Sequence, residues 1–124
     1  MVIINECEGL SEQHWAYFRL QDLTSVASDT TQRIEEAIDI GPFKTLVVEV
    51  RKPVAASGGV LKLQHASVLE EDAFVDVSSP TFDLTATGNE VQTFADLLRY
   101  LRWTTASVSS GPAQFMVDII AREQ

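Results

Sequence analysis

Hydrophobic and polar residues alternate along a ten-residue run near the C-terminus, residues 113–122. One set of alternate positions is apolar and the other mixed, with Phe115, Val117, Ile119 and Ala121 against Met116, Asp118, Ile120 and Arg122. Successive side chains of a β-strand point to opposite faces of the sheet, so this period of two predicts a strand with one buried face. A strand this apolar is ordered only if it pairs with other strands in a sheet.

A second alternating run predicts a central strand over residues 45–51, with Leu46, Val48 and Val50 on its buried face. Pro53 is expected to end that strand, because proline cannot donate to a β-ladder. Residues 60–68 alternate again after residues 55–59, a stretch with two adjacent glycines, and the pair of runs predicts a hairpin. Shorter strands are expected at residues 73–77 and 81–85, followed by a turn at residues 88–89.

Two segments fit more than one pattern. Residues 30–40 begin with threonines that could cap a helix and end at Gly41, but Ile34, Ile38 and Ile40 also alternate. We favour a strand there, paired with residues 45–51 across Gly41-Pro42. Residues 94–98 predict a helical turn and residues 99–106 a strand, which would form a second hairpin with the terminal strand across a loop at residues 107–112.

The N-terminal part adds an edge strand at residues 2–4 and an extended aromatic segment at residues 14–20. Residues 1–24 could form an N-terminal arm or an edge segment of the sheet. No alternation of strands and helices and no glycine-rich phosphate loop is present, which disfavours a parallel α/β sheet. We therefore expect one domain over residues 1–124, a mainly β antiparallel sandwich of jelly-roll type. It should have about eight strands and at most one or two short helical turns.

Charge and hydropathy exclude several partners. The 124 residues include 18 acidic and 9 basic ones, a net charge of −9, and the basic residues form no stripe for a phosphate backbone. We expect no binding to nucleic acid. No apolar run approaches the roughly 20 residues of a membrane span, and the N-terminus lacks the features of a signal peptide. Neither a membrane association nor secretion by a signal peptide is expected, so the predicted location is a cytoplasmic assembly or the surface of a particle.

Residue groups that carry out chemistry are not recognisable in the sequence. His14 and His65 have no metal-ligand spacing, and Cys7, the single cysteine, has no visible base beside it. His65 shares a strand face with leucines and should be half-buried and hydrogen-bonded. The acidic residues 70–72 lack the pattern of a dedicated calcium loop. We expect no catalytic, cofactor-binding or metal-binding residues and a protein that is not an enzyme.

Aromatic and outward apolar residues suggest a surface for other molecules. Residues 15–19 are dense in aromatics and arginine, which are enriched at subunit interfaces, and three outward strand positions are apolar. The interface candidates are Trp15, Tyr17, Phe18, Arg19, Val47, Met116 and Ile120. The alternative is a platform for sugar rings, formed by Trp15, Tyr17, Tyr100 and Trp103.

The runs at residues 43–51, 59–66 and 98–103 resemble the strand rhythm of jelly-roll sandwiches of the discoidin or galactose-binding type. They also resemble small β accessory proteins of phage virions and related protein shells. The resemblance covers about the last two-thirds of the chain. It implies a structural protein that oligomerises with itself and joins or decorates a larger protein assembly. A carbohydrate-binding module is the alternative that it implies.

Overall fold

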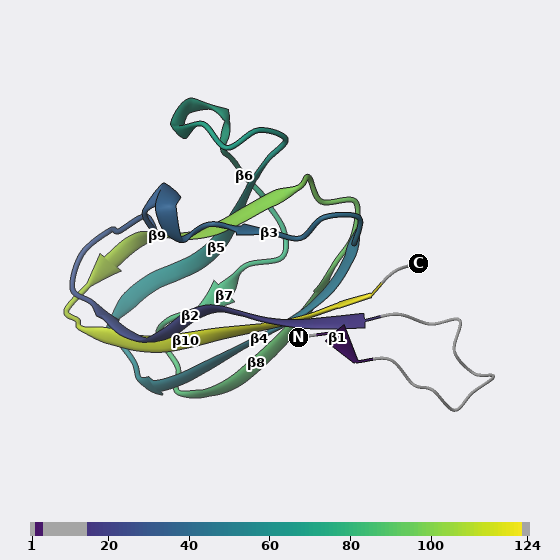
Figure 1. Ribbon diagram of the computed structural model, residues 1–124. Helices are drawn as coiled ribbons and strands as arrows, with labels where there is room; N and C mark the ends of the chain where they lie inside the picture. Colours follow the sequence, from purple (N-terminus) through teal and green to yellow (C-terminus); the bar gives the residue numbers. More distant parts are fainter. Residues whose placement is uncertain (1, 4–14, 123–124) are drawn as a thin grey trace.

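The computed structural model describes residues 2–3 and 15–122, which form two antiparallel β-sheets packed face to face (Figure 1). The first sheet contains, in spatial order, β1 (Val2–Ile3), β2 (Trp15–Val26), β10 (Ala113–Arg122), β4 (Thr45–Val54) and β8 (Gly88–Phe94). The second contains β3 (Ile38–Asp39), β9 (Tyr100–Ser109), β5 (Gly58–Ala66) and β6 (Val75–Asp76), with β7 (Phe82–Asp83) also paired to β5. Two single 3₁₀ turns, η1 (Ile34–Glu36) and η2 (Glu71–Ala73), are the helical elements of the described residues. The predicted mainly β sandwich is confirmed.

The chain alternates between the two sheets as it proceeds. It passes from β2 in the first sheet to β3 in the second, back to β4, across to β5, β6 and β7, and then through β8, β9 and β10 in turn. As a result β10 lies between β2 and β4, and β9 lies between β3 and β5. This interleaving of two sheets is the jelly-roll arrangement that the sequence predicted.

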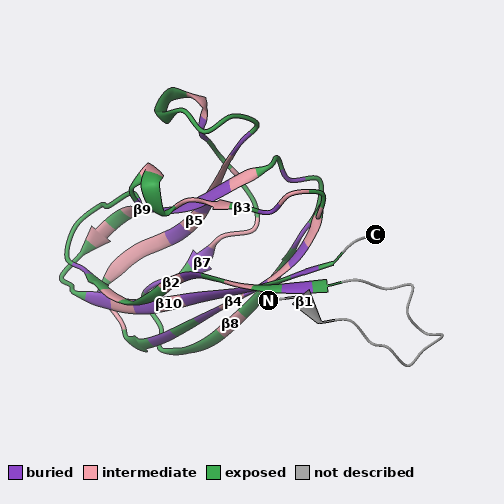
Figure 2. Cartoon of the chain, in the orientation of Figure 1, coloured by how far each residue is buried: buried purple, intermediate pink, exposed green. Residues whose placement is uncertain are grey.

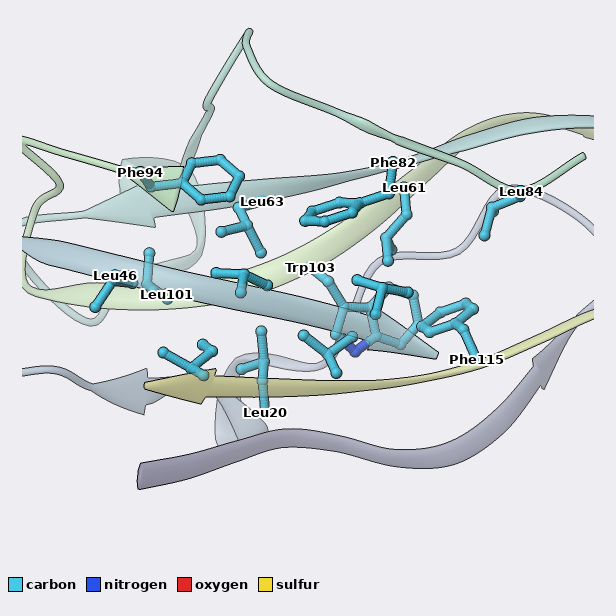
Figure 3. Close-up of a cluster of buried hydrophobic side chains, with 14 of the residues drawn as sticks. Leu20, Leu46, Leu61, Leu63, Phe82, Leu84, Phe94, Leu101, Trp103 and Phe115 are labelled. Atoms are coloured by element: carbon cyan, nitrogen blue, oxygen red, sulfur yellow. The ribbon is translucent and has the colours of Figure 1, made fainter. Parts of the chain in front are cut away.

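The alternating runs bury the faces that were expected. Leu46, Val48 and Val50 of β4 have no exposed surface, and the four apolar positions of β10 are equally buried. They meet Leu61, Leu63 and the aromatic rings of the second sheet (Figure 3). Figure 2 shows that strands of both sheets contain buried stretches. Trp103 and Phe115 pack edge to face with ring centres 5.0 Å apart, which ties β9 to β10 across the core.

Both predicted hairpins are wrong, because the chain crosses to the other sheet where a turn was expected. After β4 the crossing at residues 55–57 is fixed by the Ala56 N–H, which donates to Leu84 O, and by the Ser57 N–H, which donates to Ser109 O. The two glycines of the expected turn belong to β5, and Pro53 lies inside β4 instead of ending it. The terminal strand likewise pairs with β2 and β4, not with β9.

The ambiguous segments also differ from the expectation. Residues 30–40 contain a bridge at Thr31, the turn η1 and the short strand β3, which pairs with β9 and not with residues 45–51. Residues 88–94 form strand β8, so the expected turn at residues 88–89 and the helical start at residue 94 are both wrong. The strands expected near residues 73–77 and 81–85 are present as β6 and β7, each two residues long.

The N-terminal segment is part of the first sheet. β2 pairs with β10 from Trp15 opposite Arg122 to Val26 opposite Ala113, and β1 adds to its other side at Trp15 and Ala16. Residues 17–24 therefore run along the edge of the sheet and do not extend away from it as an arm. Residues 4–14, with Cys7 and His14, lie outside the described residues. Across the described ranges, no helix is long and apolar enough to cross a membrane.

Candidate functional site

The outer face of the second sheet is covered by segments of the same chain. On β9 the outward residues Arg102 and Thr104 are only 4% and 8% exposed. The Thr31 and Thr104 hydroxyls are 2.7 Å apart, and the Arg102 guanidinium lies 4.4 Å from the Phe74 ring. Segments around residues 31 and 71–74 therefore shield this face from water.

The outer face of the first sheet is open in the part of the chain that the structure describes. Tyr17 on β2, Ile120 on β10 and Val91 on β8 keep 37%, 41% and 57% of their surfaces exposed. Large apolar residues scattered singly on a surface are ordinary, but neighbouring ones mark contact sites. The strand register shows whether these exposed residues are scattered or lie next to one another.

The register places Tyr17 and Ile120 side by side with two further outward residues, Trp15 and Val47. Ile120 lies directly opposite Tyr17 on one neighbouring strand and opposite Val47 on the other, and Trp15 follows beside Tyr17 at the end of β2. Directly opposed residues in antiparallel strands have Cβ atoms about 5 Å apart. We call Trp15, Tyr17, Val47 and Ile120 the apolar row. It crosses the sheet from β2 through β10 to β4.

A buried carboxylate lies next to this row. The side chain of Asp118 is 7% exposed although it points outward from β10. Its Oδ1 accepts hydrogen bonds from Tyr17 Oη at 2.5 Å and Arg19 Nε at 2.6 Å, and its Oδ2 accepts one from Arg51 Nη2 at 2.9 Å. Asp118 thus joins β2, β10 and β4 on the outer face.

The ionisation of Asp118 follows from these contacts. Burial raises the pKa of Asp118, but hydrogen bonds from Arg19 and Tyr17 and the charges of Arg19 and Arg51 outweigh it, so the pKa lies below its ordinary value. The hydrogen bond to Asp118 raises the pKa of Tyr17. Near neutral pH the cluster therefore holds a carboxylate between two guanidinium groups, with the tyrosine hydroxyl protonated.

Charges on the outer face nearly cancel. The arginines of this face are Arg19, Arg51 and Arg122, and the acids on or beside it are Asp22, Glu49 and Asp118. The whole chain carries a net charge of −9. The negative excess therefore lies on other parts of the surface, and the outer face combines a neutral balance with exposed aromatic and arginine side chains.

Six of the seven interface candidates share this face: Trp15, Tyr17, Arg19, Val47, Met116 and Ile120. The exception is Phe18, which points to the core side and packs edge to face on Phe43 at 6.5 Å between ring centres. Alternation along β2 puts Phe18 on the face opposite to Tyr17, so Phe18 does not share the outer face. Asp118 and Arg51 were missed, because outward polar residues on a strand are usually solvated and no local signal marks them otherwise.

The remaining candidates have structural surroundings. His65 is half-buried and its Nδ1 accepts the Leu98 N–H at 3.1 Å, as expected, and burial lowers the pKa of His65. Trp103 is 3% exposed and donates its indole N–H to Gln21, so it cannot stack on a sugar ring as the platform hypothesis required. No group of three His, Cys, Asp or Glu side chains that could hold a metal ion occurs among residues 2–3 and 15–122.

Comparisons with known proteins give matches of fold alone. No family model and no curated protein matches this chain. The SPBc2 prophage-derived protein YomS has a TM-score of 0.58 at 12% identity, with 93% of this chain and 98% of YomS covered. A structure of Bacillus endospore appendages, which form disulfide-linked pili, has a TM-score of 0.54 at 10% identity, with 98% of both chains covered. The same sandwich thus occurs in a prophage-derived protein and in a protein that forms pili.

Proposed function

We propose that the protein is a non-enzymatic structural subunit that assembles with other copies of itself through the outer face of the first sheet. The observation that carries the proposal is the contrast between the two sheets. Over β9 the outer face of the second sheet is covered by the chain's own segments, whereas Trp15, Tyr17 and Ile120 of the apolar row on the first sheet remain exposed. Aromatic residues and arginine are the residue types enriched where subunits meet.

The dimensions of the face also support an interface. Four strands spaced about 4.8 Å apart and about ten residues long at about 3.3 Å per residue cover a face of roughly 600 Å². Specific protein interfaces bury about 800 Å² on each partner, counted over side chains that protrude from the surface. The first sheet is therefore large enough to supply most of one side of such an interface.

The particle to which the subunit belongs is a finer part of the proposal. The resemblance to accessory proteins of phage virions, together with the fold shared with a prophage-derived protein and a pilus protein, favours a role in or on a larger protein assembly. The near-neutral outer face fits protein contact, because a chain of charge −9 repels its copies least where its charges balance.

Sedimentation velocity over protein concentrations up to about 1 mM tests the proposal. The wild-type protein should form larger species as its concentration rises, and Ile120→Glu should remain monomeric, because a carboxylate would be buried among apolar residues. Val54→Glu is the matched control, since Val54 is 39% exposed, close to the 41% of Ile120, but lies at the end of β4 away from the apolar row. A wild-type protein that stays monomeric, or an Ile120→Glu variant that associates as the wild type does, would refute the proposal.

A further inference from the structure

A second exposed apolar patch lies on the loop that carries η2. Residues 67–74 connect β5 to β6 and project from the molecule together with Val75, the first residue of β6 (Figure 1). Val68 and Leu69 in the loop and Val75 at the start of β6 are 46%, 50% and 54% exposed. We call residues 67–75 the acidic knob. Its apolar side chains are as exposed as those of the apolar row, and neither patch is covered by another described part of the chain.

The acidic knob is held in place by Arg102 beneath it. The Arg102 guanidinium donates to Glu71 Oε2 at 2.8 Å and lies over the Phe74 ring, while its Nε donates to Gln64 on β5. Backbone hydrogen bonds from Glu70 N to Val68 O and from Ala73 N to Glu70 O close the loop internally. A preformed loop loses less conformational entropy when it binds than a flexible one does.

The outer face of the first sheet is the surface on which the acidic knob meets the least repulsion, because the charges of this face balance while the chain as a whole carries a net charge of −9. Residues 67–75 contain Glu70, Glu71 and Asp72 and no basic residue. On the outer face Arg19 and Arg51 are paired with Asp118, but their side chains remain 38% and 45% exposed and can also contact an incoming carboxylate. Apolar contact flanked by charges of opposite sign favours one orientation and excludes others.

We propose that the acidic knob of one copy docks on the outer face of the first sheet of the next copy. This inference rests on the proposed function and names the surface that meets the apolar row. Figure 1 shows the acidic knob beyond the second sheet and the first sheet as the opposite layer of the sandwich. A contact between two different surfaces on opposite sides of a subunit does not close on itself, so the product is an open chain of subunits.

The size of the acidic knob sets the expected strength of this contact. Three apolar side chains and three carboxylates form a smaller surface than a standard interface, and contacts of this size are weak. Assembly should therefore depend steeply on concentration. It should also weaken when the salt concentration is raised from about 0.05 M to about 0.5 M, because exposed charge pairs are screened at that ionic strength.

Mixing two complementary variants tests the inference. Ile120→Glu removes the receiving surface and keeps the acidic knob, whereas Leu69→Lys damages the acidic knob and keeps the receiving surface. Each variant alone should associate at least about tenfold more weakly than the wild type, because residues at the centre of an interface carry most of its binding energy. A one-to-one mixture should form a dimer with one copy of each and no longer species, since only one intact contact can be made.

Sedimentation velocity with a fluorophore on one variant measures this dimer, and circular dichroism checks that both variants are folded. The control Val54→Glu should form long species by itself and join either variant. If Leu69→Lys associates like the wild type while Ile120→Glu does not, two outer faces meet each other and the inference is wrong, although the proposed function stands. If Ile120→Glu also associates like the wild type, or if the wild type is monomeric, the proposed function fails with it.

Discussion

Replacement of Asp118 by asparagine should destabilise the protein by removing the charge that joins three strands. Four hydrogen-bond donors converge on its two oxygens, one from Tyr17, two from Arg19 and one from Arg51, at 2.5 to 3.3 Å. An asparagine has one acceptor oxygen and one NH₂ group, so one side of the cluster would place donor against donor. The two guanidinium groups would also lose the negative charge between them.

The expected loss is about 2–3 kcal/mol of the free energy of unfolding. Removing one partner of a buried ion pair costs about 3–5 kcal/mol, whereas exposed pairs contribute about 0–1 kcal/mol. Asp118 is buried, but the side chains of its partners Arg19 and Arg51 are 38% and 45% exposed. Water can therefore replace part of the hydrogen bonding and charge stabilisation that these guanidinium groups lose. A domain of this size has a stability of roughly 6–18 kcal/mol, so the variant should still fold.

Urea unfolding followed by tryptophan fluorescence at low protein concentration measures this change without a contribution from self-association. Asp22→Asn is the control, because Asp22 contacts the same Arg19 at 3.2 Å but its side chain is 83% exposed, and a change within about 0.5 kcal/mol is expected. If Asp118→Asn differs from the wild type by no more than the control does, the cluster does not stabilise the fold as argued.

The pH dependence provides a second measurement of the same group. Because the pKa of Asp118 is lower in the folded than in the unfolded protein, the unfolded chain binds the proton first on acidification. The stabilising effect of Asp118 is therefore complete above the unfolded pKa of about 4 and is lost as the pH falls through the lower folded pKa. The difference between wild type and Asp118→Asn should be constant from about pH 5 to 7 and should shrink below about pH 4. A difference that grows on acidification would contradict this assignment.

Three further outcomes are expected. Phe115→Ala should lower the free energy of unfolding by about 3–5 kcal/mol in urea titrations, because the ring is fully buried against Trp103, and a loss below about 1 kcal/mol would mean that the core collapses around the gap. Arg102→Met should speed amide hydrogen exchange in residues 67–75 more than in β10, and equal exchange in both segments would show that Arg102 does not hold the acidic knob. Burial lowers the pKa of His65, so the wild type should lose stability as the pH falls from 7 through the unfolded pKa of about 6.5, and the loss should be smaller in His65→Gln. Parallel stability profiles of wild type and His65→Gln would contradict this.

The sequence predicted the faces of strands better than their partners. Alternation in residues 45–51 and 113–122 identified the buried side chains of β4 and β10, because it reports which face a residue occupies. It carries no information about which strand lies alongside, so two crossings between sheets were interpreted as hairpins. Strand β8 was missed because its core side carries Glu90 and Gln92 before Phe94, and this side does not read as an apolar face.

In the candidate site, too, the face of a residue could be predicted from the sequence, but its neighbours on other strands could not. The outward positions Val47, Met116 and Ile120 followed from the period of two, and Trp15, Tyr17 and Arg19 followed from their residue types. Asp118 and Arg51 were not predicted. Asp118 depends on Arg19 and Arg51, which are distant in sequence and meet it only through the register of β2 and β4 against β10. A single sequence contains no pattern from which that register could be derived.

The position of β10 between β2 and β4 also determines when the first sheet can form. Among the described strands, β2 and β4 are joined only through β10, which is synthesised after both, so a nascent chain carries two unsatisfied strand edges until residues 113–122 are available. Folds dominated by such distant pairings fold slowly, on a timescale of roughly milliseconds to seconds. Premature aggregation during synthesis is therefore the main hazard for this chain, and a truncation before residue 113 should yield insoluble protein and not a smaller soluble domain.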